Sequence, residues 1–189
     1  MKFISAEKMR ALEEKLFDRG ISVTELMEKV GRKCAETIES KKGTGNRVLV
    51  FCGPGNNGGD GLVCARYLKD NNIVGIVMAG GPKTVEAKTN YRRAREAGIP
   101  LVRMENAKDF RADIVIDALL GIGAEGPLRG KIKKACSAVH SMGGFIVSID
   151  VPTGAGQENR VKPDATLAIH APKAEGGEIW TVDIGIPKE

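Results

Sequence analysis

The sequence has few side chains that bind transition metals. Its 189 residues include only two histidines and four cysteines. The cysteines (Cys34, Cys52, Cys64 and Cys136) show no C-x-x-C spacing. These absences argue against a zinc site and against a disulfide framework. They predict buried, reduced thiols of the kind found in cytoplasmic proteins.

Long apolar runs and strong charge are also missing. No apolar run approaches eighteen residues and no cleavable signal is recognisable, so we expect neither a membrane span nor secretion. The net charge is only +5, and aromatic residues make up 4% of the chain. The basic residues are scattered without interleaved aromatics, which argues against a nucleic-acid-binding track. We therefore expect a soluble, cytoplasmic protein with neither nucleic acid nor membrane as a partner.

Apolar runs and helical patterns alternate along most of the chain, and this alternation predicts a parallel sheet with helices on both faces. The expected strands are 47–52, 73–78, 99–103, 113–118, 145–150, 165–171 and 179–184, and the expected helices are 6–19, 23–39, 60–69, 84–96 and 128–142. The last two strands lack a helix between them and should extend one edge. The fold class is therefore α/β, a three-layer α/β/α sandwich with a mostly parallel central sheet and two leading helices. A length of 189 residues fits a single domain over 1–189.

The two leading helices carry clear boundary signals. Ser5 can cap the first helix, whose apolar positions share one face, and Gly20 is a suitable stop. Ser22 and Glu25 form a capping box for the second. Such a pair either covers one side of the sheet or forms a subunit contact, and both alternatives remain open.

A glycine-rich segment, GPGNNGGDG at 53–61, follows the first expected strand. Its first six residues match the dinucleotide pattern G-x-G-x-x-G, but no acidic residue follows strand 73–78 to bind a ribose. A phosphate-binding P-loop is excluded because no lysine follows the last glycine. What remains is a loop with two carboxamides, Asn56 and Asn57, and one carboxylate, Asp60. The alternative interpretation is a tight strand-to-helix turn with Asp60 as the helix cap.

Two later strands also end in polar residues. DIVIDALLGIGAEG delivers Asp117 and then three glycines, and FIVSIDVPTG delivers Asp150 and then Thr153. Ligands of parallel sheets bind outside the carboxyl ends of the strands, so we expect these side chains to converge: Asn56, Asn57, Asp60, Asp117, Asp150 and Thr153. In unlike surroundings, two aspartates can divide into a charged cation ligand and a proton-transferring group. The alternative is that both aspartates cap the segments that follow them.

Three segments, NNGGDG at 56–61, DALLGIG at 117–123 and SIDVPTG at 148–154, resemble the YjeF N-terminal domain family, the NAD(P)H-hydrate epimerases. The resemblance extends to SAEKMRALE and ELMEKVGR in the leading helices and to PDATLAIHAPK at 163–173, so it covers nearly the whole chain. It implies a Rossmann-like fold. Thr153 stands where serine is commoner, and the kinase-like dehydratase domain fused to many relatives is expected to be absent.

The resemblance implies an isomerase that interconverts the R and S epimers of hydrated NADH and NADPH. It implies that the second glycine loop receives the phosphates and that Asp150, the catalytic residue, lies against the hydrated nicotinamide ring. The implied substrate-binding residues are Asn56, Asn57, Gly58, Gly59, Asp60, Gly121, Ile122, Gly123, Ala124, Glu125, Gly126, Pro127 and Asp150. It further implies one potassium ion per subunit at Asn57, Asp117 and Thr153, whose oxygens suit a hard cation. Epimerisation requires proton transfers, which Asp150 can supply by general acid-base catalysis.

Partners and alternatives complete these expectations. We expect a small-molecule substrate, a homodimer built on the leading helices, and functional coupling to a separate ADP- or ATP-dependent dehydratase. One alternative is a non-catalytic scaffold of the same fold that serves dimerisation and RNA or protein contact. Another is a hydrolase of a different nucleotide-like metabolite. Asp150 and the intact NNGGD favour an enzyme over the scaffold.

Overall fold

The computed structural model describes residues 3–185 and contains a six-stranded sheet in the order β2-β1-β3-β4-β5-β6. Every strand pairing is parallel. The strands are β1 (Arg47–Cys52), β2 (Ile73–Met78), β3 (Ile114–Ala118), β4 (Phe145–Ile149), β5 (Ala165–Ile169) and β6 (Glu178–Val182). As predicted, β5 and β6 extend one edge without a helix between them.

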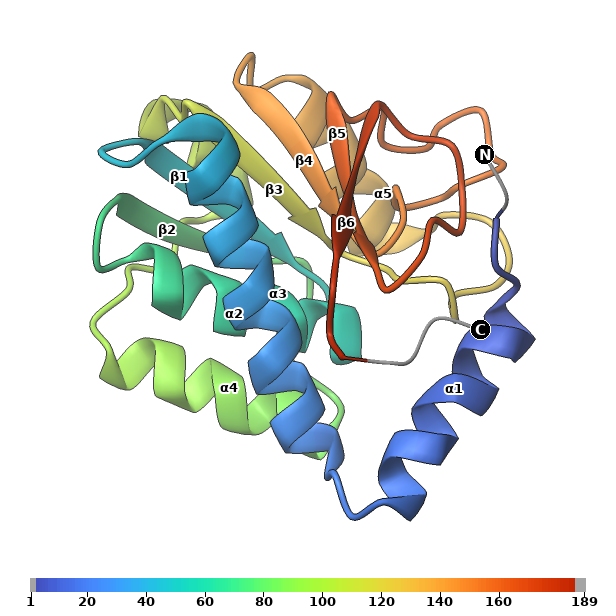
Figure 1. Cartoon of the computed structure of the whole chain (residues 1–189). Helices are drawn as coiled ribbons and strands as arrows, with labels where there is room; N and C mark the ends of the chain where they lie inside the picture. The colour runs from blue at the N-terminus through green and yellow to red at the C-terminus, as the bar shows by residue number, and fades with distance from the viewer. Residues whose placement is uncertain (1–2, 186–189) are drawn as a thin grey trace.

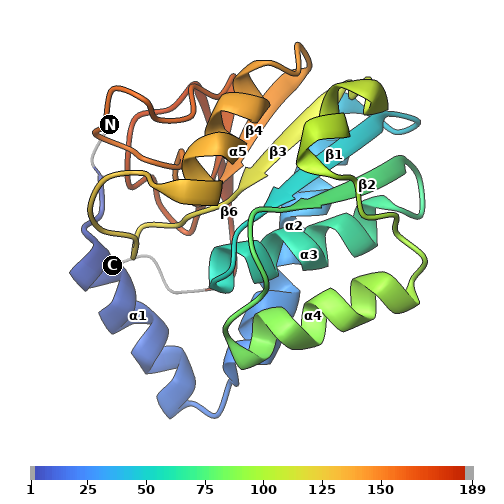
Figure 2. The ribbon, with the colours of Figure 1, turned by 180° about the vertical axis from the view of Figure 1, so that it is seen from behind.

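Helices cover both faces of this sheet, which confirms the three-layer α/β/α sandwich (Figure 1). One face carries α2 (Val23–Lys42), α3 (Asn56–Leu68) and α4 (Val85–Glu96), and the other carries α5 (Gly130–His140) and the short 3₁₀ helix η1 (Met104–Phe110), seen from behind in Figure 2. Alternate residues of β1 enter two separate apolar clusters, with Val48 and Val50 on the α3 side and Leu49 and Phe51 on the α5 side. This alternation follows from the two-residue period of a strand.

The first helix, α1 (Ala6–Asp18), lies beyond the carboxyl ends of the strands and apart from the α2–α3–α4 layer (Figure 1). Its cap is Ser5, and the Ser22–Glu25 capping box begins α2, both as predicted. The apolar face of α1 (Met9, Leu12 and Leu16) is buried in the same cluster as α2 and α3. The two leading helices therefore have different surroundings, since α2 covers a sheet face and α1 covers the end of the sheet.

Several expected boundaries were wrong. The helix expected at 60–69 begins at Asn56, so both asparagines lie in its first turn rather than in a loop. The strand expected at 99–103 is a single bridge from Leu101 to Ile76, because Pro100 has no N–H to donate and Leu101 lies at the open edge beyond β2. The strand expected at 165–171 ends before His170, whose φ of 64° turns the chain out of the sheet.

Two further expectations are tested directly by the structure. All four cysteines are buried and free, as predicted. Within residues 3–185, no helix combines the length and hydropathy that crossing a bilayer requires.

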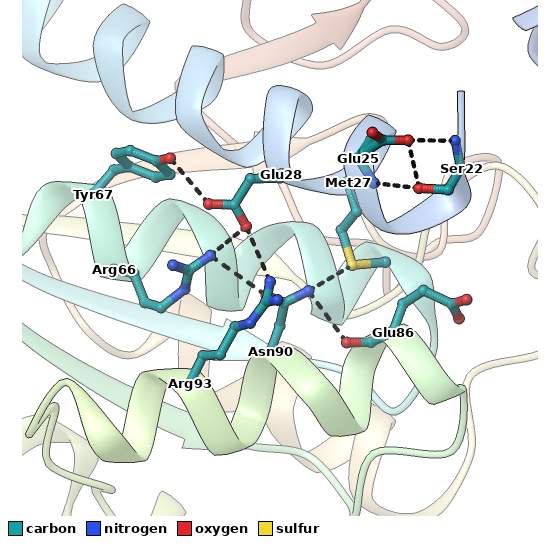
Figure 3. Close-up of polar contacts among 9 residues, drawn as sticks. All are labelled: Ser22, Glu25, Met27, Glu28, Arg66, Tyr67, Glu86, Asn90 and Arg93. Carbon is teal, nitrogen blue, oxygen red and sulfur yellow. Dashed lines mark hydrogen bonds and ion pairs between the residues drawn. The ribbon is translucent and has the colours of Figure 1, made fainter. Parts of the chain in front are cut away.

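A carboxylate on α2 links the three helices of one layer (Figure 3). Glu28 pairs with Arg66 of α3 and accepts a 2.9 Å hydrogen bond from the hydroxyl of Tyr67. Arg93 of α4 lies 3.6 Å from the same carboxylate. Because these groups are only partly exposed, their attraction is screened less than that of a surface ion pair. The layer that holds α3 is thus fixed on both sides of that helix.

Asn90 of α4 supports the same helix nearer its start (Figure 3). Its buried amide donates to the sulfur of Met27 at 3.2 Å and to the carbonyl of Glu86 at 3.2 Å. Met27 in turn occupies the space that a side chain at Gly59 would need. The first turn of α3 is therefore backed by α2 and α4.

The turn from β1 into α3 requires glycine at two positions where main-chain segments touch. A Cβ atom at Gly53 would lie 1.7 Å from the carbonyl oxygen of Leu119, and one at Gly58 would lie 2.0 Å from the carbonyl oxygen of Gly53. These obstacles are main-chain atoms, which cannot move without displacing the loop after β3. The close approach brings the start of α3 against the residues that follow β3.

We predict that Gly53→Ala lowers the free energy of unfolding by about 3 kcal/mol, because an inserted methyl group must displace packed backbone. Urea unfolding measures this change. The matched control is Gly81→Ala, since a Cβ there meets open space and needs no left-handed backbone. Gly81→Ala should be neutral or stabilising by about 0.5 kcal/mol. Equal stabilities for the two variants would contradict the close approach.

Candidate active site

A cavity of about 550 Å³ opens at the carboxyl ends of the parallel strands. Its walls come from α1, the start of α2, the first turn of α3 and the loop that follows β3. Seven polar or charged side chains line it: Arg10, Glu13, Asn56, Asn57, Asp60, Asp150 and Lys173. This position agrees with the predicted crevice, and the volume falls in the range of small-molecule sites.

The first turn of α3 presents two carboxamides to this cavity. The N-cap of the helix is Gly55, which has no side chain to satisfy the exposed N–H groups. Both polar atoms of the Asn57 side chain are buried without a hydrogen-bond partner. An unpaired buried polar group costs about 1–3 kcal/mol, so this amide is arranged for a group that the chain itself does not supply. Gly58 and Gly59, expected to bind substrate, pack against protein instead of lining the cavity.

Asp60 does not cap the helix, so that alternative was wrong. It lies one turn inside α3 and is partly exposed to the cavity. Burial raises the pKa of Asp60 well above its ordinary value, and the nearby carboxylates of Asp150 and Glu13 raise it further, while Lys173 opposes them. The protonated form of Asp60 is therefore favoured relative to that of an exposed aspartate.

Glu13 is a second carboxyl group of the same kind, and it comes from α1. Burial raises the pKa of Glu13, as does Asp150, whereas Lys173 and Arg10 lower it. Sequence reasoning missed this residue. The available signal was a glutamate next to the apolar stripe of the first helix, where a charged side chain needs a partner.

Asp150 is held in one orientation. It follows β4 with a left-handed backbone (φ 71°), which turns its side chain toward the loop after β3. Its Oδ2 accepts a hydrogen bond from the N–H of Ile122 at 2.9 Å, and its Oδ1 lies 2.7 Å from Nζ of Lys173. Lys173 was also missed, although it ends an apolar stretch that follows the fifth strand. Both oxygens of Asp150 are therefore engaged by donors from other segments.

Asp117 and Thr153 lie beneath the cavity rather than in its wall. The Thr153 hydroxyl donates to Asp117 Oδ1 at 2.7 Å, its N–H donates to Oδ2 at 2.9 Å, and Ser148 donates to Oδ2 at 2.8 Å. The N–H of Leu119 completes the set at 3.2 Å, so Asp117 also caps the segment after it. Burial raises the pKa of Asp117 while these bonds oppose that rise. Of the six residues expected to converge, four line the cavity, and these two connect the loops below it.

Only part of the second glycine loop reaches the main cavity. Gly121, Ile122, Gly123 and Ala124 line it, whereas Glu125 and Pro127 do not. Gly126 lines an adjacent cavity of about 190 Å³, closed partly by Gln157, which bonds to the carbonyl of Gly126 and the N–H of Leu128. The helix expected from 128 begins at Gly130. The loop is thus longer than predicted, and its first half faces the site.

The potassium ligands implied by resemblance fit a hard cation in part. Asn57 has an unpaired buried amide oxygen, which suits such an ion. Asp117 and Thr153 are also oxygen donors, but they already bond to each other. Among residues 3–185, no group of three or more His, Cys, Asp or Glu is placed to hold a metal ion.

A family model described as "YjeF-related protein N-terminus" matches residues 23–175. The chain belongs to this family. The YjeF-related match includes the three loops that follow β1, β3 and β4, which confirms the resemblance based on those segments. Glu13 and the rest of α1 precede the matched range.

Relatives in this family differ in how much of their length the chain covers. A protein of Archaeoglobus fulgidus named "Bifunctional NAD(P)H-hydrate repair enzyme Nnr" is 39% identical over all of this chain, which covers only 42% of that relative. Proteins named "NAD(P)H-hydrate epimerase" from Elusimicrobium minutum and Nitrosopumilus maritimus are 34% and 30% identical. The alignments cover 100% and 98% of this chain and 98% and 96% of those proteins. The crystal structure of yeast ynu0, YNL200c, matches with a TM-score of 0.79 and 25% identity, over 92% of this chain and 82% of that one.

We predict that Asp60→Asn raises the melting temperature progressively as pH increases. The folded-state pKa of Asp60 is raised, so the stability linked to its proton is complete below the unfolded pKa of about 3.9 and is lost as pH rises through the folded value. Asparagine cannot ionise and avoids that loss. Thermal melts between about pH 4 and pH 8 measure the difference. Glu14→Gln, on the exposed side of α1, is the control. Parallel pH curves for wild type and Asp60→Asn would contradict the raised pKa of Asp60.

Proposed function

We propose that this protein is an NAD(P)H-hydrate epimerase, an isomerase that interconverts the R and S epimers of hydrated NADH and NADPH. The observation that carries the proposal is the immobilised carboxylate of Asp150 in a cavity that also holds two carboxyl groups, Glu13 and Asp60, whose pKa values burial raises. The names of two relatives whose lengths the chain almost fully covers support the same activity. The 25% identity and high TM-score to yeast ynu0 support the fold on which it depends.

The arrangement supports proton transfer in both directions. If the ring opens, one group accepts the hydroxyl proton as the C–N bond breaks, and another group donates a proton to the ring nitrogen. If water leaves instead, one group protonates the departing hydroxyl, and its conjugate base accepts a proton when water adds back. Asp150, next to a lysine and an amide N–H, is suited to accept. Asp60, whose pKa is well above its ordinary value, is suited to donate. Carboxyl groups in unlike environments divide these tasks in other enzymes.

Other walls of the cavity suit the remaining parts of the substrate. Asn56 and Asn57 offer amide groups to hydroxyls of ribose or the carboxamide of the ring. The backbone N–H groups of Gly121 and Gly123 suit phosphate oxygens, whereas that of Ile122 already donates to Asp150. No acidic ribose clamp follows β2, so we propose limited preference between NADH and NADPH hydrates.

The proposal includes one potassium ion per subunit at Asn57, Asp117 and Thr153. The unpaired Asn57 amide supports it, as does the exclusively oxygen-based donor set. When bound, the cation would supply a fixed positive charge. Asn57 and Thr153 contribute neutral oxygens, and Asp117 orients Thr153.

The proposal extends to partners and to location. Phe3, just before α1, and Phe17, on α1, remain exposed, which supports a homodimer. The main apolar face of that helix is already buried within the chain. A monomeric mass in light scattering at micromolar concentration would contradict the dimer. A separate ADP- or ATP-dependent dehydratase would complete the repair, and the four buried free cysteines support a cytoplasmic location.

We predict that Asp150→Asn lowers the rate of epimerisation by about 10²–10⁴-fold, because the amide keeps the shape but cannot exchange a proton. Asp60→Asn should also lower it, by about 10²-fold, as the partner in proton transfer. Separated R and S hydrates, followed by chromatography at constant potassium, give the rates. Near-normal activity of Asp150→Asn would remove this residue from the mechanism. An unchanged epimer ratio with wild-type protein, beyond the slow uncatalysed drift, would remove the proposed function.

We predict that Thr153→Val weakens potassium binding while keeping the fold, because it removes one oxygen at similar volume. Titration of the potassium-free protein with KCl or RbCl, followed by calorimetry, measures the affinity. Thr181→Val on β6 is the control, since its exposed side chain lies outside both cavities. No binding to the wild-type protein would exclude the ion site, whatever the outcome for the variant.

A further inference from the structure

Lys173 is a charged residue whose side chain is buried in the cavity wall. Its side chain is only 1% exposed, and its Nζ lies 2.7 Å from Asp150 Oδ1 and 2.7 Å from the carbonyl oxygen of Ile169. Burying a lysine is costly unless its charge is paired. Two of its three donors therefore bind groups of the chain, and one of these groups is the carboxylate assigned to proton transfer.

The backbone around Lys173 is shaped to bring it back to the sheet. His170 leaves β5 with a φ of 64°, and its N–H bonds to the carbonyl of Val182 at 2.8 Å. The carbonyl of Pro172 accepts a 2.9 Å hydrogen bond from the N–H of Ile4, just before α1. Lys173 is thus fixed by contacts to β5 and by its neighbour's contact with the amino-terminal segment.

The charges facing this ammonium group explain why it matters. Glu13 on α1, Asp60 on α3 and Asp150 after β4 are three carboxyl groups that share one buried lysine, with Arg10 acting on Glu13. Like charges disfavour ionisation, and an adjacent cation favours it. Asp150 is the carboxyl group in direct contact with the ammonium group, at 2.7 Å, so the charge of the lysine acts most strongly there.

We infer that Lys173 is a positioning residue for the proposed epimerisation, whose ammonium group holds Asp150 in one orientation and in the ionised form that accepts a proton. The inference rests on the proposed function and adds a residue that acts through Asp150. A role as the phosphate-binding cation is disfavoured, since the side chain is almost fully enclosed and its charge is already paired. Nor is it a simple structural pair, because the carboxylate it holds lines the cavity.

Four variants test this inference: Lys173→Met, Lys173→Arg, Asp150→Asn and the double variant Lys173→Met/Asp150→Asn. Lys134→Met, on the exposed side of α5, is the matched control. Each is assayed for the pH dependence of kcat/KM with separated hydrate epimers, and each is melted to verify folding. Lys173→Met leaves the Asp150 carboxylate without its cation, which destabilises the fold. The double variant removes that carboxylate as well, so it provides a second folded protein that lacks the lysine.

Lys173→Met is expected to lower kcat/KM by about 10²-fold at neutral pH. The ascending limb of its pH profile should move to higher pH, since an adjacent cation favours the charged form of a carboxyl group and the variant lacks it. Lys173→Arg should restore much of the activity and the position of that limb, and Lys134→Met should change neither. In the Asp150→Asn background, Lys173→Met should cause little further loss, because both changes act on one step.

Three results would overturn the inference. The first is an unchanged pH profile in folded Lys173→Met. The second is a further large loss when Lys173→Met is added to Asp150→Asn, which would place the lysine on the substrate. The third is a loss of kcat/KM that comes only from a rise in KM and that Lys173→Arg does not rescue. Inactive wild-type protein would instead refute the proposed function, and in that case the melts of the single and double variants still show whether Lys173 and Asp150 are coupled.

Discussion

The site depends on one buried carboxylate, that of Asp117, and on the four hydrogen bonds it accepts from Leu119, Ser148 and Thr153. Asp117 is fully enclosed, so each of these bonds is stronger than its equivalent in water, and losing one would leave a buried acceptor unsatisfied. The bonds join the end of β3 to β4 and to the loop after it. The loop carrying Ile122 can therefore reach Asp150, so the Asp117 network also sets the position of this contact in the cavity wall.

The fold follows from patterns that are local in sequence. Apolar runs of β1 and β3, caps such as Ser5 and the Ser22–Glu25 box, and the alternation of strands and helices specified the layers and the parallel sheet. The failures were also local in origin. The start of α3 was misplaced because Asn56, Asn57 and Gly58 are poor helix formers that tertiary contacts hold in a helical turn.

The position of the candidate site was predictable because parallel strands bring their carboxyl ends to one edge. The residues reached by long-range contacts were not. Glu13 and Lys173 belong to segments far apart in the chain, and only the placement of α1 and the turn after β5 reveals that they meet the same aspartate. Likewise, Asp117 and Thr153 looked equivalent to Asp150 in sequence, yet the structure buries them under the cavity.

The hydrogen bond from the N–H of Ile4 to the carbonyl of Pro172 affects the order in which the protein folds during synthesis. The wall of the cavity joins the first helix to a segment that is translated only after β5. A nascent chain stopped before β5 would already contain Asp60 and Asp150 but would lack the cation that balances them. Such long-range closure slows folding. Mutual neutralisation of the charged groups should accordingly follow the synthesis of β5 and of the turn after it, and a chain released earlier would hold these carboxyl groups without their cation.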